Sequence, residues 1–146
     1  MKKFIIFVFS FFLLSLNVLA ENTINISGEK NLIINHSGVY VVKIKADGII
    51  SKLNITYSVS DNIKVDKIEI GKSFNKVTSS NNNYVLSSNV NNGDVLNITV
   101  KGNSVSSGKI SIIKCVATIN GEEVNLLENS FNVNIINNDD LERVKR

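Results

Sequence analysis

The residue types that most often carry out catalysis are scarce in this sequence. His36 is the only histidine and Cys115 the only cysteine among 146 residues. The Ser-His and Cys-His pairs that activate nucleophiles, and zinc sites rich in histidine and cysteine, therefore lack their usual parts. His36 stands in Asn35-His36-Ser37-Gly38, between two predicted strands. We interpret it as a solvated turn residue rather than a catalytic base.

The acidic residues do not supply an acid and a base for hydrolysis either. Glu122-Glu123 and Asp139-Asp140 are adjacent in the sequence, and adjacent residues of a strand point to opposite faces. A glycosidase instead needs two carboxyl groups that flank one bond. No glycine-rich loop of the kind that holds phosphate is present. The sequence predicts no catalytic residue, and we expect a protein that is not an enzyme.

Oxygen-bearing side chains of the kind that calcium prefers occur at three places. They are Asp61-Asn62, Asn81-Asn82-Asn83 and Asp94. Their spacing does not indicate a particular site, so we predict neither a bound metal nor a cofactor.

Cys115 lies in an apolar run beside Val116 and Ala117. Reactive thiols stand in exposed, electropositive surroundings, whereas this neighbourhood is apolar. We predict that Cys115 is a small buried hydrophobe. As the single cysteine, it cannot form an internal disulfide.

The N-terminus has the pattern of a secretory signal peptide. Lys2 and Lys3 precede an almost wholly apolar run from Phe4 to Leu19, and Ala20 is the small residue before the expected cleavage site. The alternative is an uncleaved anchor, but the run is short for a bilayer span of roughly 20 residues. We expect residues 1–20 to be removed, leaving a secreted or cell-surface protein without a stable membrane span.

The mature chain is nearly neutral. Lys2 and Lys3 belong to the predicted signal peptide, so the formal charge falls from 16 − 13 = +3 to 14 − 13 = +1. No remaining basic cluster could follow a phosphate backbone, which argues against nucleic acid as a partner.

Alternating apolar and polar residues recur about every ten residues after position 21, as in short antiparallel strands. In the run 49–59 the apolar side is Ile49, Leu53, Ile55, Tyr57 and Val59, and the polar side is Lys52, Asn54, Thr56 and Ser58. In the run 96–100, Leu96, Ile98 and Val100 face inward, and Asn97 and Thr99 face outward.

Polar segments separate these runs. Residues 73–83 predict a loop, and Asn91-Asn92-Gly93-Asp94 predicts a turn. Apolar residues at helical spacing are missing. We predict an all-β fold: an antiparallel jelly-roll β-sandwich of about nine strands over residues 21–136, followed by a charged flexible tail at 137–146.

The order of the motifs in this domain resembles bacterial cohesin domains. The strand "GDVLNITVKG", the turn "SVSSG", the turn "NGEEV" and the last strand "SFNVNI" follow each other as in that family. The earlier stretch "GIISKLNITYSVSDNIKVDKIEIGKSF" is similar more loosely, and the likeness covers roughly residues 30–136. Ser58 follows Tyr57 here, where the family often has Asp.

The resemblance implies a binding module that captures a dockerin-like protein partner in an extracellular polysaccharide-degrading assembly. It implies a binding sheet made of the third, fifth, sixth and eighth strands, which we place at 50–58, 84–89, 95–100 and 112–119. The outward residues of this sheet are then the predicted partner-binding set: Lys52, Asn54, Thr56, Ser58, Asn97 and Thr99. The same polarity also fits the wet side of an ordinary antiparallel sheet.

Two other function classes remain open on the sequence. A carbohydrate-binding sandwich would stack sugar rings on exposed aromatic side chains; Phe74 and Tyr84, beside the predicted loop, are the candidates for binding polysaccharide. A structural subunit of a surface or adhesin assembly is the third class. The sequence shows no missing strand of the kind that donor-strand assembly requires.

Overall fold

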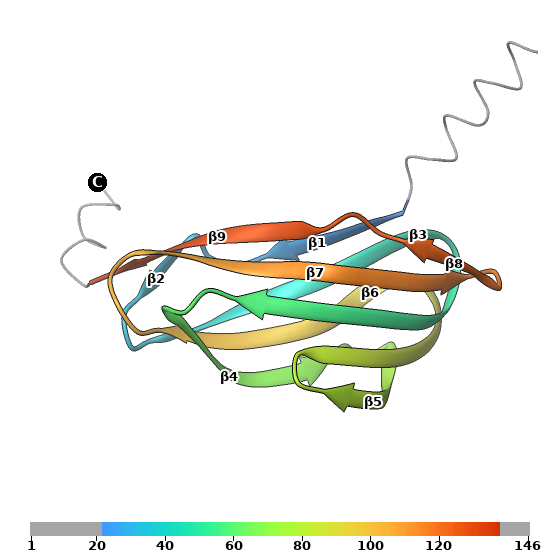
Figure 1. The fold of residues 1–146 in the computed structure, drawn as a ribbon, viewed down its shortest axis with the longest axis horizontal. Coiled ribbons are helices and arrows are strands. Elements are labelled where there is room, and N and C mark those ends of the chain that lie inside the picture. The colour runs from blue at the N-terminus through green and yellow to red at the C-terminus, as the bar shows by residue number, and fades with distance from the viewer. Residues whose placement is uncertain (1–21, 138–146) are drawn as a thin grey trace, which may run out of the picture.

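The computed structural model describes residues 22–137, and this part of the chain is built from strands alone. The predicted signal peptide and residues 138–146 of the predicted tail lie outside the described residues (Figure 1). The strands are β1 (Thr23–Ser27), β2 (Asn31–Ile33), β3 (Ser37–Val59), β4 (Ile63–Ile70), β5 (Phe74–Ser80), β6 (Asn83–Gly102), β7 (Ser107–Ile119), β8 (Glu122–Asn125) and β9 (Asn129–Ile136). Among the described residues, no helix of a length and hydropathy suited to a membrane span occurs.

The strands form one hydrogen-bonded sheet that folds over into two layers, because β3 and β6 each take part in both (Figure 1). Residues 37–45 of β3 pair with residues 92–101 of β6, and residues 50–56 pair with residues 83–90. The pairing shifts register between Lys45 and Ile50. Such a shift bends a strand and increases its twist.

We name the layers by one strand of each. The β7 layer contains β5, residues 83–90 of β6, residues 50–59 of β3 and β7, with β8 and β9 paired to the far side of β7. The β1 layer contains β1, residues 37–45 of β3, residues 92–102 of β6 and β4. β2 pairs with β9, and this is a parallel pair in an otherwise antiparallel structure.

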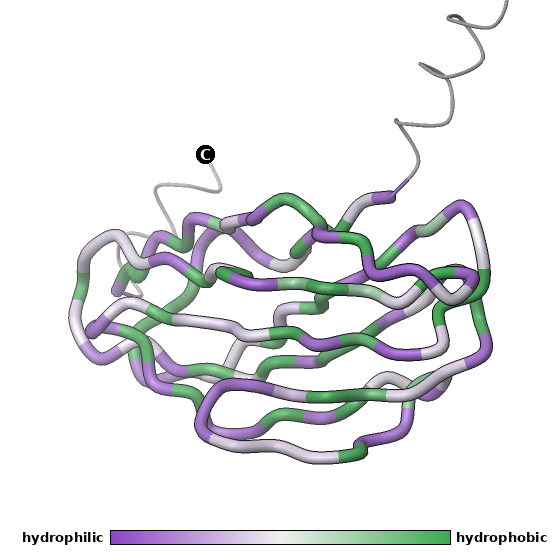
Figure 2. The backbone as a smooth tube through the Cα atoms, turned by 45° about the vertical axis from the view of Figure 1, so that its right-hand side comes forward, coloured by the Kyte–Doolittle hydropathy of each residue, from purple (hydrophilic) through white to green (hydrophobic). Residues whose placement is uncertain are grey.

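The core lies between the two layers and is apolar. Along β3, buried Leu53, Ile55 and Tyr57 alternate with more exposed polar residues, and Figure 2 shows this alternation along most strands. No polar or charged residue of the described chain is buried. Burying one Leu or Ile side chain contributes roughly 1.5–3 kcal/mol, so the apolar sides of the alternating strands favour packing of the two layers face to face.

The prediction of an all-β antiparallel sandwich is confirmed, but three local predictions are wrong. Residues 73–83 are not a loop, because β5 occupies most of that segment. Asn91–Asp94 is not a turn but part of β6, where Gly93 adopts φ of 151°. Ile49 is 49% exposed while Ile50 is fully buried, because the register shift between Ile50 and Lys52 moves the alternation by one residue, from even positions up to Ile50 to odd positions from Leu53.

Candidate functional site

The predicted residues of β3 lie together on the outer face of the β7 layer. Lys52 is paired with Ser87 and Thr118, Asn54 with Val85 and Val116, and Thr56 with Asn83 and Lys114. Paired residues of antiparallel strands project to the same side. Leu53 and Ile55, which alternate with these residues along β3, face the core. The row Lys52, Asn54 and Thr56 therefore faces solvent. Ser58 pairs with Ser111 at the end of the same face.

A hydrogen-bonded cluster occupies the centre of this face. Asn83 Nδ2 donates to Asn54 Oδ1 over 2.7 Å and to Thr56 Oγ1 over 2.8 Å. All three side chains are half-buried. The cluster holds Asn54 and Thr56 in fixed positions on a rigid sheet. The sequence did not identify Asn83, because it stands in a segment predicted as loop and meets β3 only through the strand register.

Asn97 and Thr99 lie elsewhere. They pair with Val41 and Val39 of β3 and therefore belong to the β1 layer. The prediction that they stand beside Asn54 and Thr56 is wrong. The sequence analysis counted residues 84–89 as the fifth strand and residues 95–100 as the sixth. The unpredicted strand β5 precedes both segments and moves each one place later in that count, so residues 95–100 no longer belong to the binding sheet that the cohesin resemblance implies.

One end of the β7 layer carries an apolar projection. The pairing of β3 with β7 shifts between Thr56 and Tyr57, which leaves Ile113 as the extra residue of a bulge. Ile113 is 48% exposed. It lines a hollow of about 430 Å³ with Thr56, Ser58 and Asn81–Asn83.

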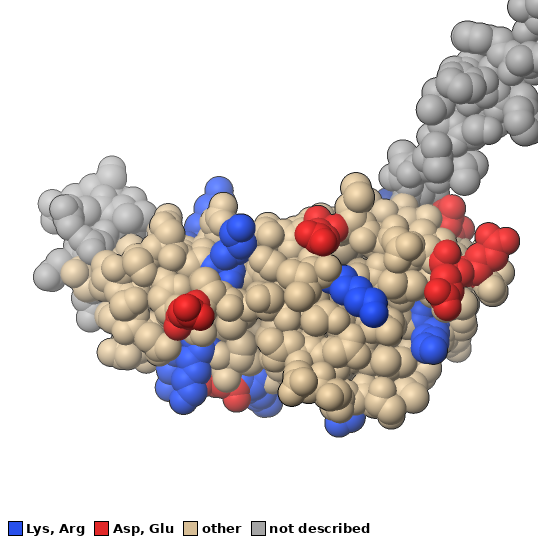
Figure 3. All heavy atoms as spheres, in the orientation of Figure 1, with Lys and Arg blue, Asp and Glu red and all other residues tan. Residues whose placement is uncertain are grey.

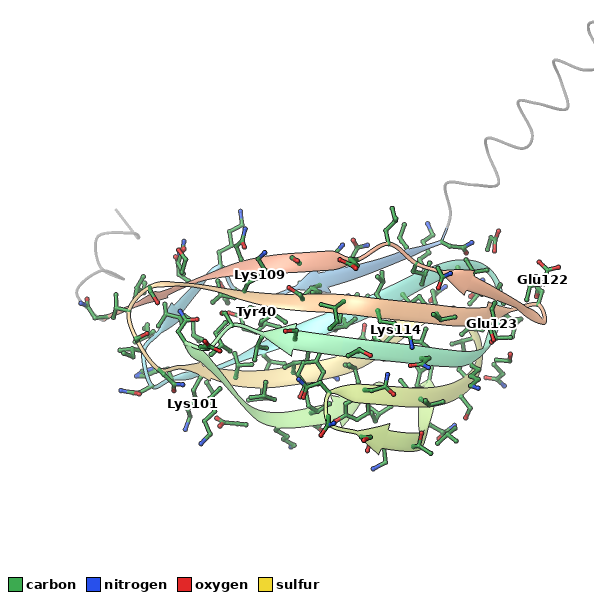
Figure 4. All side chains as sticks on the ribbon, viewed as in Figure 1. Tyr40, Lys101, Lys109, Lys114, Glu122 and Glu123 are labelled. Carbon is green, nitrogen blue, oxygen red and sulfur yellow. The ribbon has the colours of Figure 1, made fainter. Side chains whose placement is uncertain are left out.

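A second hollow, of about 150 Å³, lies further along the same face. Its walls are Lys52, Asn54, Lys114, Val116, Thr118 and Glu123. Figure 4 shows Lys109 and Lys114 projecting from β7, with Glu122 and Glu123 on the hairpin at its end. Figure 3, in the same orientation, shows that most of this surface is formed by uncharged residues, with individual charged side chains scattered among them.

No protein-family model and no curated protein matches the sequence. The fold, however, is similar to several solved structures. A cohesin module from a Clostridium perfringens family 33 glycoside hydrolase aligns with a TM-score of 0.68 at 10% identity, over 80% of this chain and 98% of that one. A type II cohesin domain from the cellulosome of Acetivibrio cellulolyticus gives 0.63 at 11% identity, over 77% and 95%.

A non-cellulosomal cohesin from the archaeon Archaeoglobus fulgidus gives a TM-score of 0.60 at 12% identity, over 84% of this chain and 97% of that one. The domain is cohesin-like in its fold. The alignments span almost the whole of each cohesin, and the resemblance predicted from the sequence motifs is thereby confirmed at the level of structure.

The cohesin-like domain does not present the aromatic residues predicted for carbohydrate binding. Phe74 is only 4% exposed, so the prediction that it is available to a sugar is wrong. Tyr84 is half-buried and stacks on Tyr57, with ring centroids 6.5 Å apart. Burial, and then the neighbouring Tyr84, raise the pKa of Tyr57. Within residues 22–137 the side chains of all Phe and Tyr residues are buried or half-buried.

Among the residues considered for catalysis, His36 and Cys115 lie in different surroundings, and Asp139-Asp140 lie outside the described residues. His36 is exposed in the turn after β2, and its backbone N–H donates to the Ile33 carbonyl over 3.0 Å. Cys115 is 3% exposed, as predicted, and burial raises the pKa of its thiol to about 12. The described residues contain no group of three His, Cys, Asp or Glu side chains placed to hold a metal ion.

Proposed function

We propose that this cohesin-like domain is a non-catalytic binding module that captures a protein partner on the outer face of the β7 layer. The observation that carries the proposal is the composition of this layer. It joins segments 50–58, 84–89 and 112–119 in one sheet, and the cohesin resemblance implicates all three in partner binding. The Asn54–Asn83–Thr56 cluster gives the face a fixed polar centre.

The shape of the face favours a protein over a small molecule. Small-molecule sites are concave, mostly apolar pockets that enclose the ligand, whereas the two hollows on this face are shallow and lined largely by polar residues. A rigid sheet loses little conformational entropy when a partner docks on it, which benefits affinity. Half-buried polar groups with fixed partners can then define the register of the complex.

The partner class follows from the resemblance. A dockerin-like module, carried by a protein of an extracellular polysaccharide-degrading assembly, fits the cohesin-like fold and the predicted signal peptide. Binding of the polysaccharide itself is the competing function. It would rely on hydrogen bonds, since the aromatic candidates Phe74 and Tyr84 are buried and half-buried.

The test is a binding assay of the full chain against a panel of purified dockerin modules, with insoluble cellulose and other polysaccharides as a second arm. A supporting result is saturable binding of at least one dockerin module. Retention on a polysaccharide with no dockerin bound would overturn the proposal in favour of carbohydrate binding. A chain that binds neither probe would also overturn it.

The location of the site is tested by a matched pair of double variants. Asn54→Lys/Thr56→Lys should weaken dockerin binding by at least about tenfold, because two long side chains remove the hydrogen bonds to Asn83 and block close approach of the partner at the centre of the face. Asn97→Lys/Thr99→Lys makes the same change on the β1 layer and should leave binding unchanged. Equal affinities of both variants and wild type, with normal folding shown by circular dichroism, would exclude this face.

A further inference from the structure

Two exposed lysines of the β7 layer stand above a floor of half-buried residues. Lys52 of β3 and Lys114 of β7 are exposed, whereas Asn54, Val116 and Thr118 between them are half-buried. All five line the hollow of about 150 Å³. Glu123 is the one acidic residue of its lining. The charges around this hollow are therefore two ammonium groups and one carboxylate.

The floor of the hollow adds a neutral donor. Asn54 accepts a hydrogen bond from Asn83 through its Oδ1 atom, which leaves its Nδ2 group as a donor. Within the described residues, the Nδ2 group of Asn54 has no hydrogen-bond acceptor. Two ammonium groups and an amide N–H₂ around one depression form a donor set suited to a carboxylate.

The ion pairs of the domain are distributed unevenly between the two layers. Three pairs are formed in the described chain: Lys43–Asp94 at 3.9 Å, Lys67–Glu69 at 3.2 Å and Lys101–Asp66 at 3.8 Å. All of them lie on the β1 layer. On the β7 layer, Lys52 and Lys114 form no ion pair with another described residue.

We infer that the protein partner places the carboxylate of an acidic side chain in the hollow between Lys52 and Lys114 and packs an apolar side chain against Ile113. This inference rests on the proposed docking face and adds the chemistry of its partner. Charge complementarity supports the carboxylate contact, because Lys52 and Lys114 form no ion pair within the described residues and the Nδ2 group of Asn54 is an unused donor. The apolar contact follows because Ile113 is raised from the sheet by a bulge and faces solvent over 48% of its surface.

The test uses a dockerin module that binds the wild-type chain, with two charge-reversed double variants. Lys52→Glu/Lys114→Glu should weaken binding by at least about tenfold at low salt, and the loss should shrink as salt screens the charges. Lys45→Glu/Lys64→Glu is the matched control, because these exposed lysines lie on the β1 layer and form no described ion pair. The control should bind like wild type.

Two further variants identify the individual contacts. Glu123→Gln should tighten binding, since it removes the one opposing charge from the hollow. Ile113→Ser should weaken binding without a change in salt dependence, because it removes an apolar contact. Replacing the acidic residues of the dockerin one by one with Lys should locate one that restores affinity to Lys52→Glu/Lys114→Glu.

The outcomes separate this inference from the proposed function. If a dockerin binds and Asn54→Lys/Thr56→Lys disrupts it, but Lys52→Glu/Lys114→Glu binds as tightly as wild type, the docking face is correct and the acidic contact is wrong. If both charge-reversed variants lose affinity equally, the effect comes from net charge and the inference also fails. If no dockerin module binds, both proposals fall.

Discussion

At the scale of single residues, two of the three titratable groups buried in the core, Tyr40 and Cys115, are neutral acids whose pKa is raised to about 12; Tyr57 is the third. Burial, and then the nearby Glu29 charge, raise the pKa of Tyr40 from 10.0 to about 12. Burial raises the pKa of Cys115 from 9.0 to about 12. The Tyr40 hydroxyl donates to the Glu29 carbonyl oxygen over 2.7 Å, which also requires the protonated form. Both groups therefore bind their protons more tightly in the folded state than in the unfolded state.

This difference predicts a loss of stability in alkali. A group with a raised pKa contributes stability that is fully present below its unfolded pKa and lost as pH rises through its folded pKa. The contribution of these groups to the free energy of unfolding should therefore be constant up to about pH 9 and fall between about pH 9 and 12. Urea unfolding across this range measures the slope. Cys115→Ala should flatten it, and an equally steep fall in that variant would show that the thiol does not contribute.

The burial of Cys115 was predictable from its sequence neighbours, and the hydrogen bond of Tyr40 was not. An apolar run around a lone cysteine is local information, and it indicates burial directly. The acceptor of the Tyr40 hydroxyl is a backbone carbonyl 11 residues earlier, which is reached only after β3 has folded against the segment between β1 and β2. For the same reason the sequence did not identify Asn83, whose three acceptors lie on a strand 27 to 29 residues away.

At the scale of elements, alternation predicted the strands with one wet and one dry face. It failed for β5, where Phe74 is buried and the six residues after it are exposed. β5 pairs only with β6, and an edge strand with little core contact has no alternation to detect. Missing that strand shifted the later strands by one place in the predicted order and assigned residues 95–100 to the wrong layer. The predicted residues of β3 do share one face, because the alternation of β3 is regular from Leu53 to Tyr57.

The bend in β3 gives a sharp test of the register. Ile49 and Ile50 are adjacent and chemically identical, yet Ile49 is 49% exposed and Ile50 is fully buried. Ile50→Ala should lower the free energy of unfolding by about 2–5 kcal/mol, as expected for a large side chain removed from a core. Ile49→Ala should lower it by less than about 1 kcal/mol. Chemical denaturation of the two variants measures both values, and a reversed order would mean that the alternation runs straight through from Leu53 to Ile49.

At the scale of the whole molecule, β3 and β6 make the two layers inseparable. One half of each of these strands lies in the β1 layer and the other half lies in the β7 layer. The buried residues of both layers form one core. Neither layer can therefore lose its packing while the other keeps its own. The proposed docking face is therefore supported by the whole core, which would limit the conformational entropy lost when a partner binds.

Cooperative unfolding of the described domain is the prediction that follows. Fluorescence of the tyrosines Tyr40, Tyr57 and Tyr84 and far-ultraviolet circular dichroism should report one coincident transition in urea, as expected for a two-state domain. Leu53→Ala in the β7 layer and Ile44→Ala in the β1 layer remove fully or nearly fully buried side chains from opposite sides of the core. Both should move that single transition to lower urea with the slope unchanged. A second transition in either variant would mean that the layers unfold separately, and that the β7 layer can keep its structure without support from the β1 layer.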